Sequence, residues 1–185
     1  MTGLWVLRAA DRATIPWANG GGVTQQVFLY PEDAEPDDLL WRASIATIAA
    51  PGPFSIFAGL DRWLTVIDGR LSLSIEGRLH ELGSADLPVA FAGEACAAGT
   101  PHDTPVTVFN LMVRRGGGEA RVARQASAPA GATLVVALER MTAGDGSRTI
   151  ELHPQDAVLC NGIALALSRE AIVVTITPWL ELRGP

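Results

Sequence analysis

Two arginines stand inside otherwise apolar, strand-like stretches of the sequence, where a guanidinium needs a partner or access to water. Arg42 lies in WRASIATI and Arg62 lies in DRWLTVID. Because side chains alternate along a strand, Arg42 shares one face with Ser44 and Ala46. The rigid fork of guanidinium donors binds a carboxylate at two points, so two arginines in one barrel mouth would suit a dicarboxylate. The alternative for Arg42 is an outward side chain lying over the barrel wall.

Three consecutive glycines follow a Trp and an Asn in PWANGGGVTQQ, residues 16–26. Gly20, Gly21 and Gly22 carry no Cβ, which permits positive φ angles and close approach to the main chain. We expect this loop to form a barrel rim where main-chain amides approach an anionic ligand. Trp17 would pack beside that ligand, and Asn19 would orient it by hydrogen bonding. A loop with a purely structural role is the alternative.

A polar residue interrupts the apolar stretch FNLMVR, and two serines lie in apolar surroundings. A buried Asn110 needs hydrogen-bond partners, so it either braces a turn or faces a ligand. Ser44 and Ser55 lack a GxSxG elbow and are not linked in the sequence to any His or acid, which argues against nucleophilic catalysis. The sequence therefore offers no catalytic nucleophile.

The three histidines, His80, His102 and His153, do not have the spacing that puts two imidazoles on one strand face or one helix turn. We therefore predict no bound metal and no other cofactor. All fourteen basic residues are arginine. The absence of lysine excludes a Schiff base and a phosphate-loop lysine.

The elements that must position these residues are short strands. Leu71, Leu73 and Ile75 alternate with polar residues, and an Asp-Gly turn signal at 68–69 precedes them. Similar runs, separated by Gly, Pro, Asp or Asn, lie at 23–30, 40–48, 106–113, 133–138, 149–152, 157–160, 163–167 and 172–177. One helical turn is expected at residues 36–39. We predict an all-β fold of two barrels: residues 1–115, a connector at 116–131, and a smaller barrel at 132–185, with which the N-terminal strand is a candidate to pair.

Composition narrows the class of protein. The chain has 185 residues, 48% of them hydrophobic, and a net charge of −6, with no basic run that would follow a phosphate backbone. The N-terminus carries charges where a signal peptide would be apolar, and Pro51 and Pro53 interrupt the longest apolar passage. We expect a cytoplasmic protein that binds neither nucleic acid nor membrane. Cys96 and Cys160 lie among apolar neighbours and are expected to be buried thiols.

The segments WANGGGVTQQ, LLWRASIATIAAPGPFSIFAGLDRWLTVIDG and FNLMVR, in this order and spacing, resemble the HutD/Ves family. The resemblance implies a cupin-type double β-barrel (an RmlC-like jelly roll, or bicupin) without the metal-binding histidines of typical cupins. It also implies an accessory or regulatory factor of histidine utilisation that binds a metabolite such as N-formylglutamate. The motif residues carried over by position are Trp17, Asn19, Gly20, Gly21, Gly22, Thr24, Trp41, Arg42, Ser44, Phe54, Ser55, Gly59, Arg62, Phe109, Asn110 and Met112.

Three positions depart from the family pattern. The family commonly has a basic residue after the Trp, an acid two places after the Thr, and an Asp before the Phe-Asn pair. This chain has Ala18, Gln26 and Val108 instead. The loss of two carboxylates near the expected site weakens any proposal of carboxylate acid–base catalysis.

We predict a metal-free protein, possessing no catalytic residue, that binds a small acidic metabolite. An isomerase or lyase, with Asp61, His102 and Tyr30 as acid or base candidates, is one alternative. A regulatory protein-interaction module is another, and we expect a homodimer. The expected ligand-binding residues are Trp17, Asn19, Gly20, Gly21, Gly22, Thr24, Arg42, Ser44, Phe54, Ser55, Arg62 and Asn110.

Overall fold

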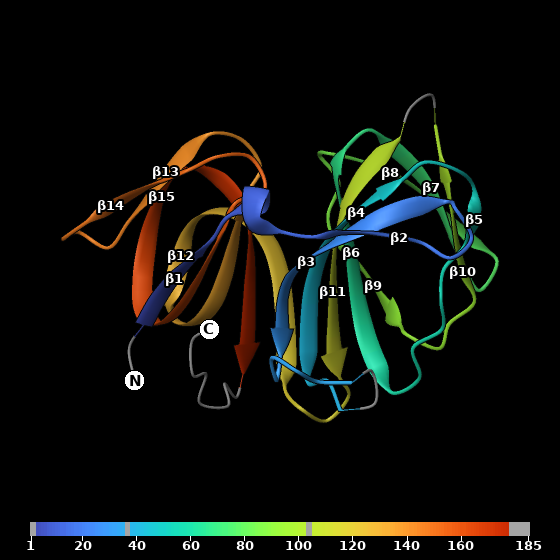
Figure 1. Ribbon diagram of the computed structural model, residues 1–185, viewed down its shortest axis with the longest axis horizontal. Coiled ribbons are helices and arrows are strands. Elements are labelled where there is room, and N and C mark those ends of the chain that lie inside the picture. The colour runs from blue at the N-terminus through green and yellow to red at the C-terminus, as the bar shows by residue number, and fades with distance from the viewer. Residues whose placement is uncertain (1–2, 36–37, 103–104, 178–185) are drawn as a thin grey trace. The chain divides into compact units, whose positions relative to one another are not determined.

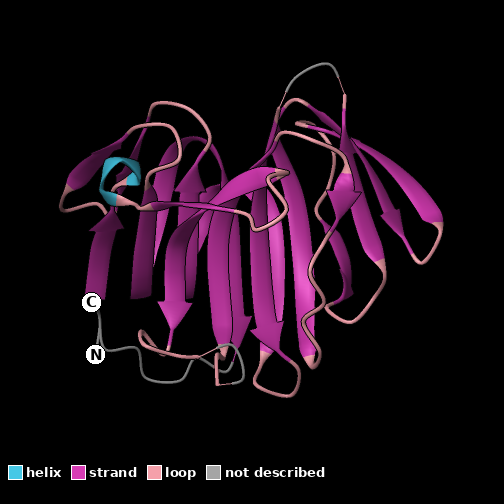
Figure 2. Ribbon diagram, turned by 45° about the vertical axis from the view of Figure 1, so that its right-hand side comes forward, coloured by secondary structure: helices cyan, strands magenta, loops and turns pink. Residues whose placement is uncertain are grey.

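The computed structural model describes residues 3–35, 38–102 and 105–177, and these divide into two compact units. The first barrel comprises residues 13–115, and the second barrel comprises residues 3–12 together with 116–177. Apart from one 3-10 turn, η1 (Ala9–Asp11), the described elements are all strands (Figure 2), so the all-β prediction is confirmed. The expected helical turn at 36–39 begins with two residues outside the described ranges.

Two sheets form the first barrel (Figure 1). The six-stranded sheet has the order β2-β3-β4-β11-β6-β9, and the four-stranded sheet has the order β5-β10-β7-β8. The strands are β2 (Thr14–Pro16), β3 (Gly22–Tyr30), β4 (Trp41–Ile48), β5 (Gly52–Pro53), β6 (Leu60–Asp68), β7 (Arg70–Ile75), β8 (Arg78–Gly83), β9 (Val89–Ala92), β10 (Ala97–Pro101) and β11 (Val106–Arg114).

The core of the first barrel follows from the period-two pattern of these strands. Alternate residues of β4, β6, β7 and β11 turn to the interior because successive side chains point to opposite faces of a strand. They form one cluster with Ala46, Ile48, Leu64, Val66, Leu71, Leu73, Leu82, Val106 and Val108 as its buried members. This cluster fills one end of the barrel, and the polar members of the same strand faces lie beyond it.

The second barrel is built around two long strands, β12 (Glu119–Ala137) and β15 (Ala157–Thr177). β12 pairs with two stretches of β15, so that Thr133 faces both Cys160 and Thr175. The sheet continues from β15 to β13 (Met141–Gly144) and β14 (Thr149–Leu152). The apolar core includes Val135, Met141, Leu152, Val158 and Leu165.

Residues 116–131, expected as a connector, instead contain the first 13 of the 19 residues of β12. Arg121 pairs with Thr175, and Ala128 pairs with Leu165. The segment is poor in large apolar side chains, so the alternation that reveals a strand in a sequence is weak here. Its neighbours in β15 supply the apolar surface instead.

The N-terminal strand β1 (Gly3–Leu7) belongs to the second barrel and not to the first, since Gly3 pairs with Asn161 and Leu7 with Ala157. Asp156, which is 2% exposed, holds the residues that follow β1 in place. Its carboxylate accepts hydrogen bonds from the Ala9 amide at 2.8 Å and from Arg8 Nη1 at 2.7 Å. The first barrel, expected to begin at residue 1, therefore begins at Ala13, and the N-terminal strand pairs with the second barrel.

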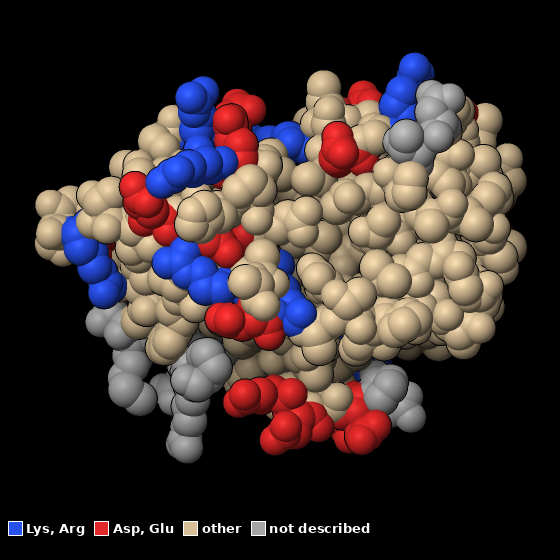
Figure 3. Space-filling view, turned by 45° about the horizontal axis from the view of Figure 1, so that its top comes forward, with Lys and Arg blue, Asp and Glu red and all other residues tan. Residues whose placement is uncertain are grey.

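Charged side chains of both signs share the face shown in Figure 3, and among the described residues this face carries no broad basic patch. No helix in the described ranges is long and apolar enough to cross a bilayer. Cys160 is buried as expected, and burial raises the pKa of its thiol to about 11. Cys96 is exposed, against expectation, because it follows a turn at the start of β10.

Candidate functional site

A cavity of about 420 Å³ lies within the first barrel. Its walls combine the inner faces of β4, β6 and β11 with the loop before β3 and the segment between β5 and β6. The lining residues are Trp17, Ala18, Asn19, Thr24, Arg42, Ser44, Ala46, Ile48, Pro53, Phe54, Ser55, Phe57, Arg62, Val108, Asn110 and Met112. All predicted ligand-binding residues except the three glycines are among them.

Strand register sets the two arginines in one row across the sheet. Met112 of β11 pairs with Arg42 on one side and with Arg62 on the other. Adjacent strands lie about 4.8 Å apart, so the two arginine backbones are separated by roughly 10 Å. Both arginines line the cavity. On β4, Trp41 and Ala43 point to the opposite face from Arg42. Of the two orientations open for Arg42, the structure shows the inward one.

Arg62 is 5% exposed and sits among three phenyl rings. Its guanidinium carbon lies 5.7, 5.4 and 4.9 Å from the ring centroids of Phe54, Phe57 and Phe91. Nη1 donates a hydrogen bond to the Ser55 carbonyl at 3.1 Å, while Nε is buried without a partner. Desolvation lowers the pKa of Arg62 to about 10, so the group remains a cation at neutral pH.

Arg42 has even less compensation. Its Nε is buried and has no hydrogen-bond partner, and burial lowers the pKa of the guanidinium. Among the described residues it forms no salt bridge, and the cavity lining contains no Asp, Glu or His. Two partly or fully desolvated cations therefore face one cavity with no counter-ion from its walls.

Next to the arginine row, Asn110 and Ser44 form a cross-strand pair that also lines the cavity. Neither side chain forms a hydrogen bond within the described residues. Asn110 lies in the middle of β11, so it does not brace a turn. Its carboxamide and the Ser44 hydroxyl are available donors and acceptors beside the cations.

The aromatic side chains Trp17 and Phe54, which line one side of the cavity, are held in place by contacts within the barrel. Trp17 Nε1 donates to Thr24 Oγ1 at 2.8 Å, and the indole packs edge-to-face on Phe54 with 6.4 Å between ring centroids. Asn19 Oδ1 accepts the Gly21 amide at 3.0 Å. The rings of Trp17 and Phe54 thus give the cavity a fixed apolar side.

The three glycines have a different place from the one expected. The Gly20 amide donates to the Trp17 carbonyl and the Gly21 amide donates to Asn19, so neither is free for an anion. Gly20 has a φ of +69°, which favours glycine. A Cβ on Gly22 would meet the Thr47 carbonyl and the Trp17 ring. The three glycines therefore shape the backbone that carries Trp17 and Asn19, and they do not line the cavity themselves.

The acid or base candidates lie outside the cavity. Asp61 pairs with Arg115 at 2.9 Å, and Tyr30 does not contribute to the lining. His102 Nε2 lies 2.6 Å from Ser72 Oγ and 3.2 Å from a carboxylate oxygen of Glu81. Within the described residues no group of three or more His, Cys, Asp and Glu side chains could hold a metal. The absence of a metal cofactor remains a prediction.

Several lining residues were not predicted. Ala46 and Ile48 extend the Arg42 face by simple alternation, and Val108 and Met112 do the same for Asn110. That signal was available in the sequence. Phe57 lies on a loop, where no periodic pattern indicates direction.

Of the three departures from the family pattern, Ala18 and Val108 line the cavity, whereas Gln26 is exposed and does not. The cavity is therefore apolar at two positions where a charged side chain was a possible alternative. Among the residues that the structure describes, no Asp or Glu lines this cavity.

Comparison with known proteins agrees with this architecture. A structure of HutD from Pseudomonas fluorescens SBW25 (formate condition) superposes with a TM-score of 0.80 and 26% identity, covering 94% of this chain and 99% of that one. A cupin 2 conserved barrel domain protein from Leptotrichia buccalis, 10% identical, shares the fold with a TM-score of 0.57 over 84% of this chain and 89% of its own. The cupin-type double barrel is thus confirmed.

Curated relatives match about half of their own length. Protein Ves of Cronobacter sakazakii is 36% identical over 101 residues, 54% of each chain. An uncharacterised 21.2 kDa protein in the hutC 3′ region of Pseudomonas putida is 40% identical over 113 residues, 60% of this chain and 59% of that protein. The HutD family model matches residues 9–175. The chain therefore belongs to the HutD family, which is linked to histidine utilisation by name and genomic context.

Proposed function

We propose that the first barrel binds a small dicarboxylate of the N-formylglutamate type, and that the protein is an accessory or regulatory factor of histidine utilisation. The observation that carries the proposal is that two cations, Arg42 and Arg62, line one cavity and that none of its other lining residues supplies a counter-ion. A buried charge without a partner is costly, so such a pair is retained where a ligand supplies the opposite charge.

The geometry of the arginine row supports two anionic groups. Arg42 and Arg62 stand on either side of Met112, with backbones roughly 10 Å apart, and both line the same cavity. One carboxylate at each guanidinium would neutralise both charges. A ligand with a single carboxylate would leave one of the two cations without a counter-ion.

Asn110 and Ser44 support an additional polar group on the ligand. They lie one row from the arginines and have no hydrogen-bond partner among the described residues. A formamide on the carbon that carries one of the two carboxylates would offer a carbonyl and an N–H to these side chains. The cavity volume of about 420 Å³ lies within the range of small-molecule sites.

Thermal-shift and calorimetric titration with N-formylglutamate tests the proposal. The wild-type protein should be stabilised, and glutamine substitution of Arg42 or Arg62 should weaken binding about 10- to 100-fold, because each removes a charge-assisted contact. Arg78→Gln is the matched control, since Arg78 is exposed on β8 outside the cavity and should leave the dissociation constant unchanged.

Ligand comparison separates the alternatives. Glutaramate and 4-formamidobutyrate, which carry one carboxylate each, should bind at least about tenfold more weakly than N-formylglutamate. Equal affinity for mono- and dicarboxylates would contradict the two-cation site. Binding that survives both arginine substitutions would place the ligand elsewhere, and no binding by any acid would favour the interaction module.

A further inference from the structure

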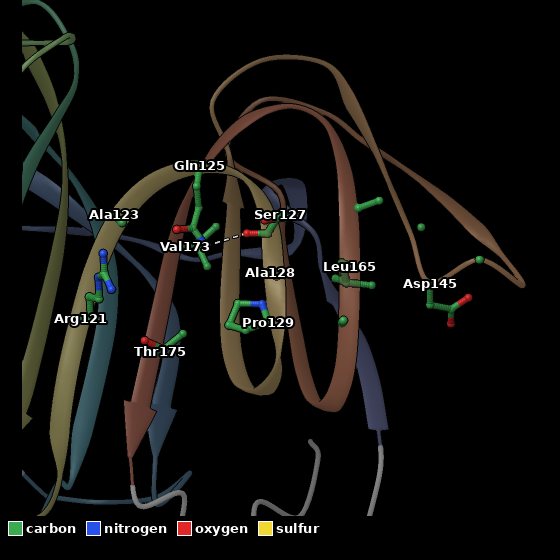
Figure 4. Close-up of a pocket in the computed structure, with 14 residues that line it drawn as sticks. Arg121, Ala123, Gln125, Ser127, Ala128, Pro129, Asp145, Leu165, Val173 and Thr175 are labelled. Carbon is green, nitrogen blue, oxygen red and sulfur yellow. Dashed lines mark hydrogen bonds between the residues drawn. The ribbon is translucent and has the colours of Figure 1, made fainter.

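The second barrel contains a cavity of its own, of about 710 Å³. One wall is the start of β12, with Arg121, Ala123 and Gln125, beside Val173 and Thr175 of β15 (Figure 4). The opposite wall is the middle of the same two strands and the turn between β13 and β14. It comprises Ser127, Ala128, Pro129, Gly144, Asp145, Gly146, Ala164, Leu165 and Ala166.

Small side chains create this space. Ala123 lines one wall, and three alanines and two glycines are among the residues of the other wall, so little side-chain volume fills the space between them. The floor is apolar because Ala128, Leu165 and Val173, each 2% exposed, belong to the core of the second barrel. The cavity is thus a hollow that ends on a packed core.

One free cation stands at an end of the cavity. Arg121 forms no hydrogen bond or salt bridge with any residue that the structure describes. It is the direct cross-strand partner of Thr175, so the guanidinium and the hydroxyl rise from neighbouring points on the same wall. Together they offer a charged fork and a hydroxyl to an anion.

Two of the other polar side chains in the lining, Asp145 and Gln125, already form hydrogen bonds. Asp145 Oδ1 accepts the Ser147 hydroxyl and amide and the Arg148 amide, and Oδ2 accepts Arg148 Nε. Gln125 Nε2 donates to the Ser127 carbonyl at 2.6 Å, which leaves its Oε1 as an acceptor. The cavity therefore contains one uncommitted positive charge and an apolar floor.

We infer that this cavity is a second small-molecule site, distinct from the one proposed in the first barrel, and that it binds a monocarboxylate with an apolar body. Arg121 and Thr175 hold the carboxylate, and the apolar body lies over Leu165 and Val173. A dicarboxylate would fit poorly, because the second carboxylate would lie on the apolar floor or near Asp145. The two barrels would then differ in the charge of their ligands.

Amide chemical shifts of ¹⁵N-labelled protein test the inference, since they report on each barrel separately. Titration with 3-phenylpropionate should shift the amides of residues 121–125 and 173–175. The neutral 3-phenylpropanamide, which matches it in size, should bind at least about tenfold more weakly, because it lacks the charge that Arg121 pairs with.

Variants complete the design. Arg121→Gln should weaken 3-phenylpropionate binding about tenfold, and Thr175→Val by a smaller factor. Arg169→Gln, at an exposed arginine of the same barrel outside the cavity, should have no effect. The inference is overturned if the shifts are confined to first-barrel residues, if the neutral amide binds equally well, or if the Arg121 variant keeps wild-type affinity.

Discussion

Replacing Arg42 with methionine should make the ligand-free protein more stable. Methionine keeps a long apolar side chain against the same walls but removes the guanidinium, whose Nε is buried without a partner. An unsatisfied buried polar group costs about 1–3 kcal/mol. Because Arg42 is only half-buried and part of its guanidinium retains hydration, we take the lower part of this range, about 1–2 kcal/mol.

The expected gain is measurable by urea unfolding and by calorimetry. For a chain of this size, 1 kcal/mol corresponds to a melting-temperature shift of about 2–4 °C. Arg78→Met is the matched control: Arg78 is exposed and its side chain forms no hydrogen bond or ion pair among the described residues, so the change should stay within about 0.5 kcal/mol. The same Arg42 variant should lose stabilisation by N-formylglutamate.

The opposite result would refute the reasoning. If Arg42→Met lowers the free energy of unfolding by 1 kcal/mol or more while Arg78→Met is neutral, Arg42 stabilises the fold and the cavity does not hold an uncompensated cation. The argument that a ligand must supply the missing charge would then fail for this residue.

Three further substitutions test the second barrel and the loop beside the first-barrel cavity. Asp156→Asn should cost about 2 kcal/mol at pH 7 by urea unfolding, since a buried carboxylate bonded to Arg8 and to the Ala9 amide loses its charge. Burial alone would raise the pKa of Asp156, but the hydrogen bonds from the Ala9 and His153 amides and Arg8 hold it below its usual value. The contribution of Asp156 to the free energy of unfolding is therefore present above about pH 4 and is lost as the pH falls further. An acid titration in which wild type and variant lose stability in parallel would contradict this. Gly22→Ala should lower the free energy of unfolding by about 3 kcal/mol, because the added Cβ would meet the Thr47 carbonyl. Gly20→Ala has open space around the added Cβ but a positive φ, so it should cost about 1 kcal/mol and leave ligand affinity unchanged. The reverse order of the two costs in urea unfolding would show that the loop has a different structure.

The inner face of β4 was predictable because it depends only on the strand period. Arg42 and Ser44 alternate with Trp41 and Ala43, so assigning a strand to residues 41–48 also assigns their face. The partners across the sheet were not predictable in the same way. Met112 lies 70 positions from Arg42 along the chain, and nothing local indicates that it stands between the two arginines.

The hydrogen-bond partners of the main-chain amides also could not be predicted from the sequence. Three glycines indicate an unusual backbone, but whether their N–H groups face a ligand or the chain depends on which carbonyls are near. Here the Trp17 carbonyl and the Asn19 side chain take two of them. The three phenyl rings around Arg62 could not be predicted for the same reason: Phe91 belongs to a strand almost thirty residues further along the chain.

The pairing of β1 with β15 has a consequence for synthesis on the ribosome. Residues 13–115 form a continuous unit, so this barrel has all its strands as soon as they emerge. Gly3, by contrast, waits for Asn161, which at about 5–20 residues per second is a delay of roughly 8–30 s. During translation the earliest strand is thus an unpaired edge while a later segment is already able to fold, and the nascent chain has an interval in which β1 is open to other strands or to chaperones.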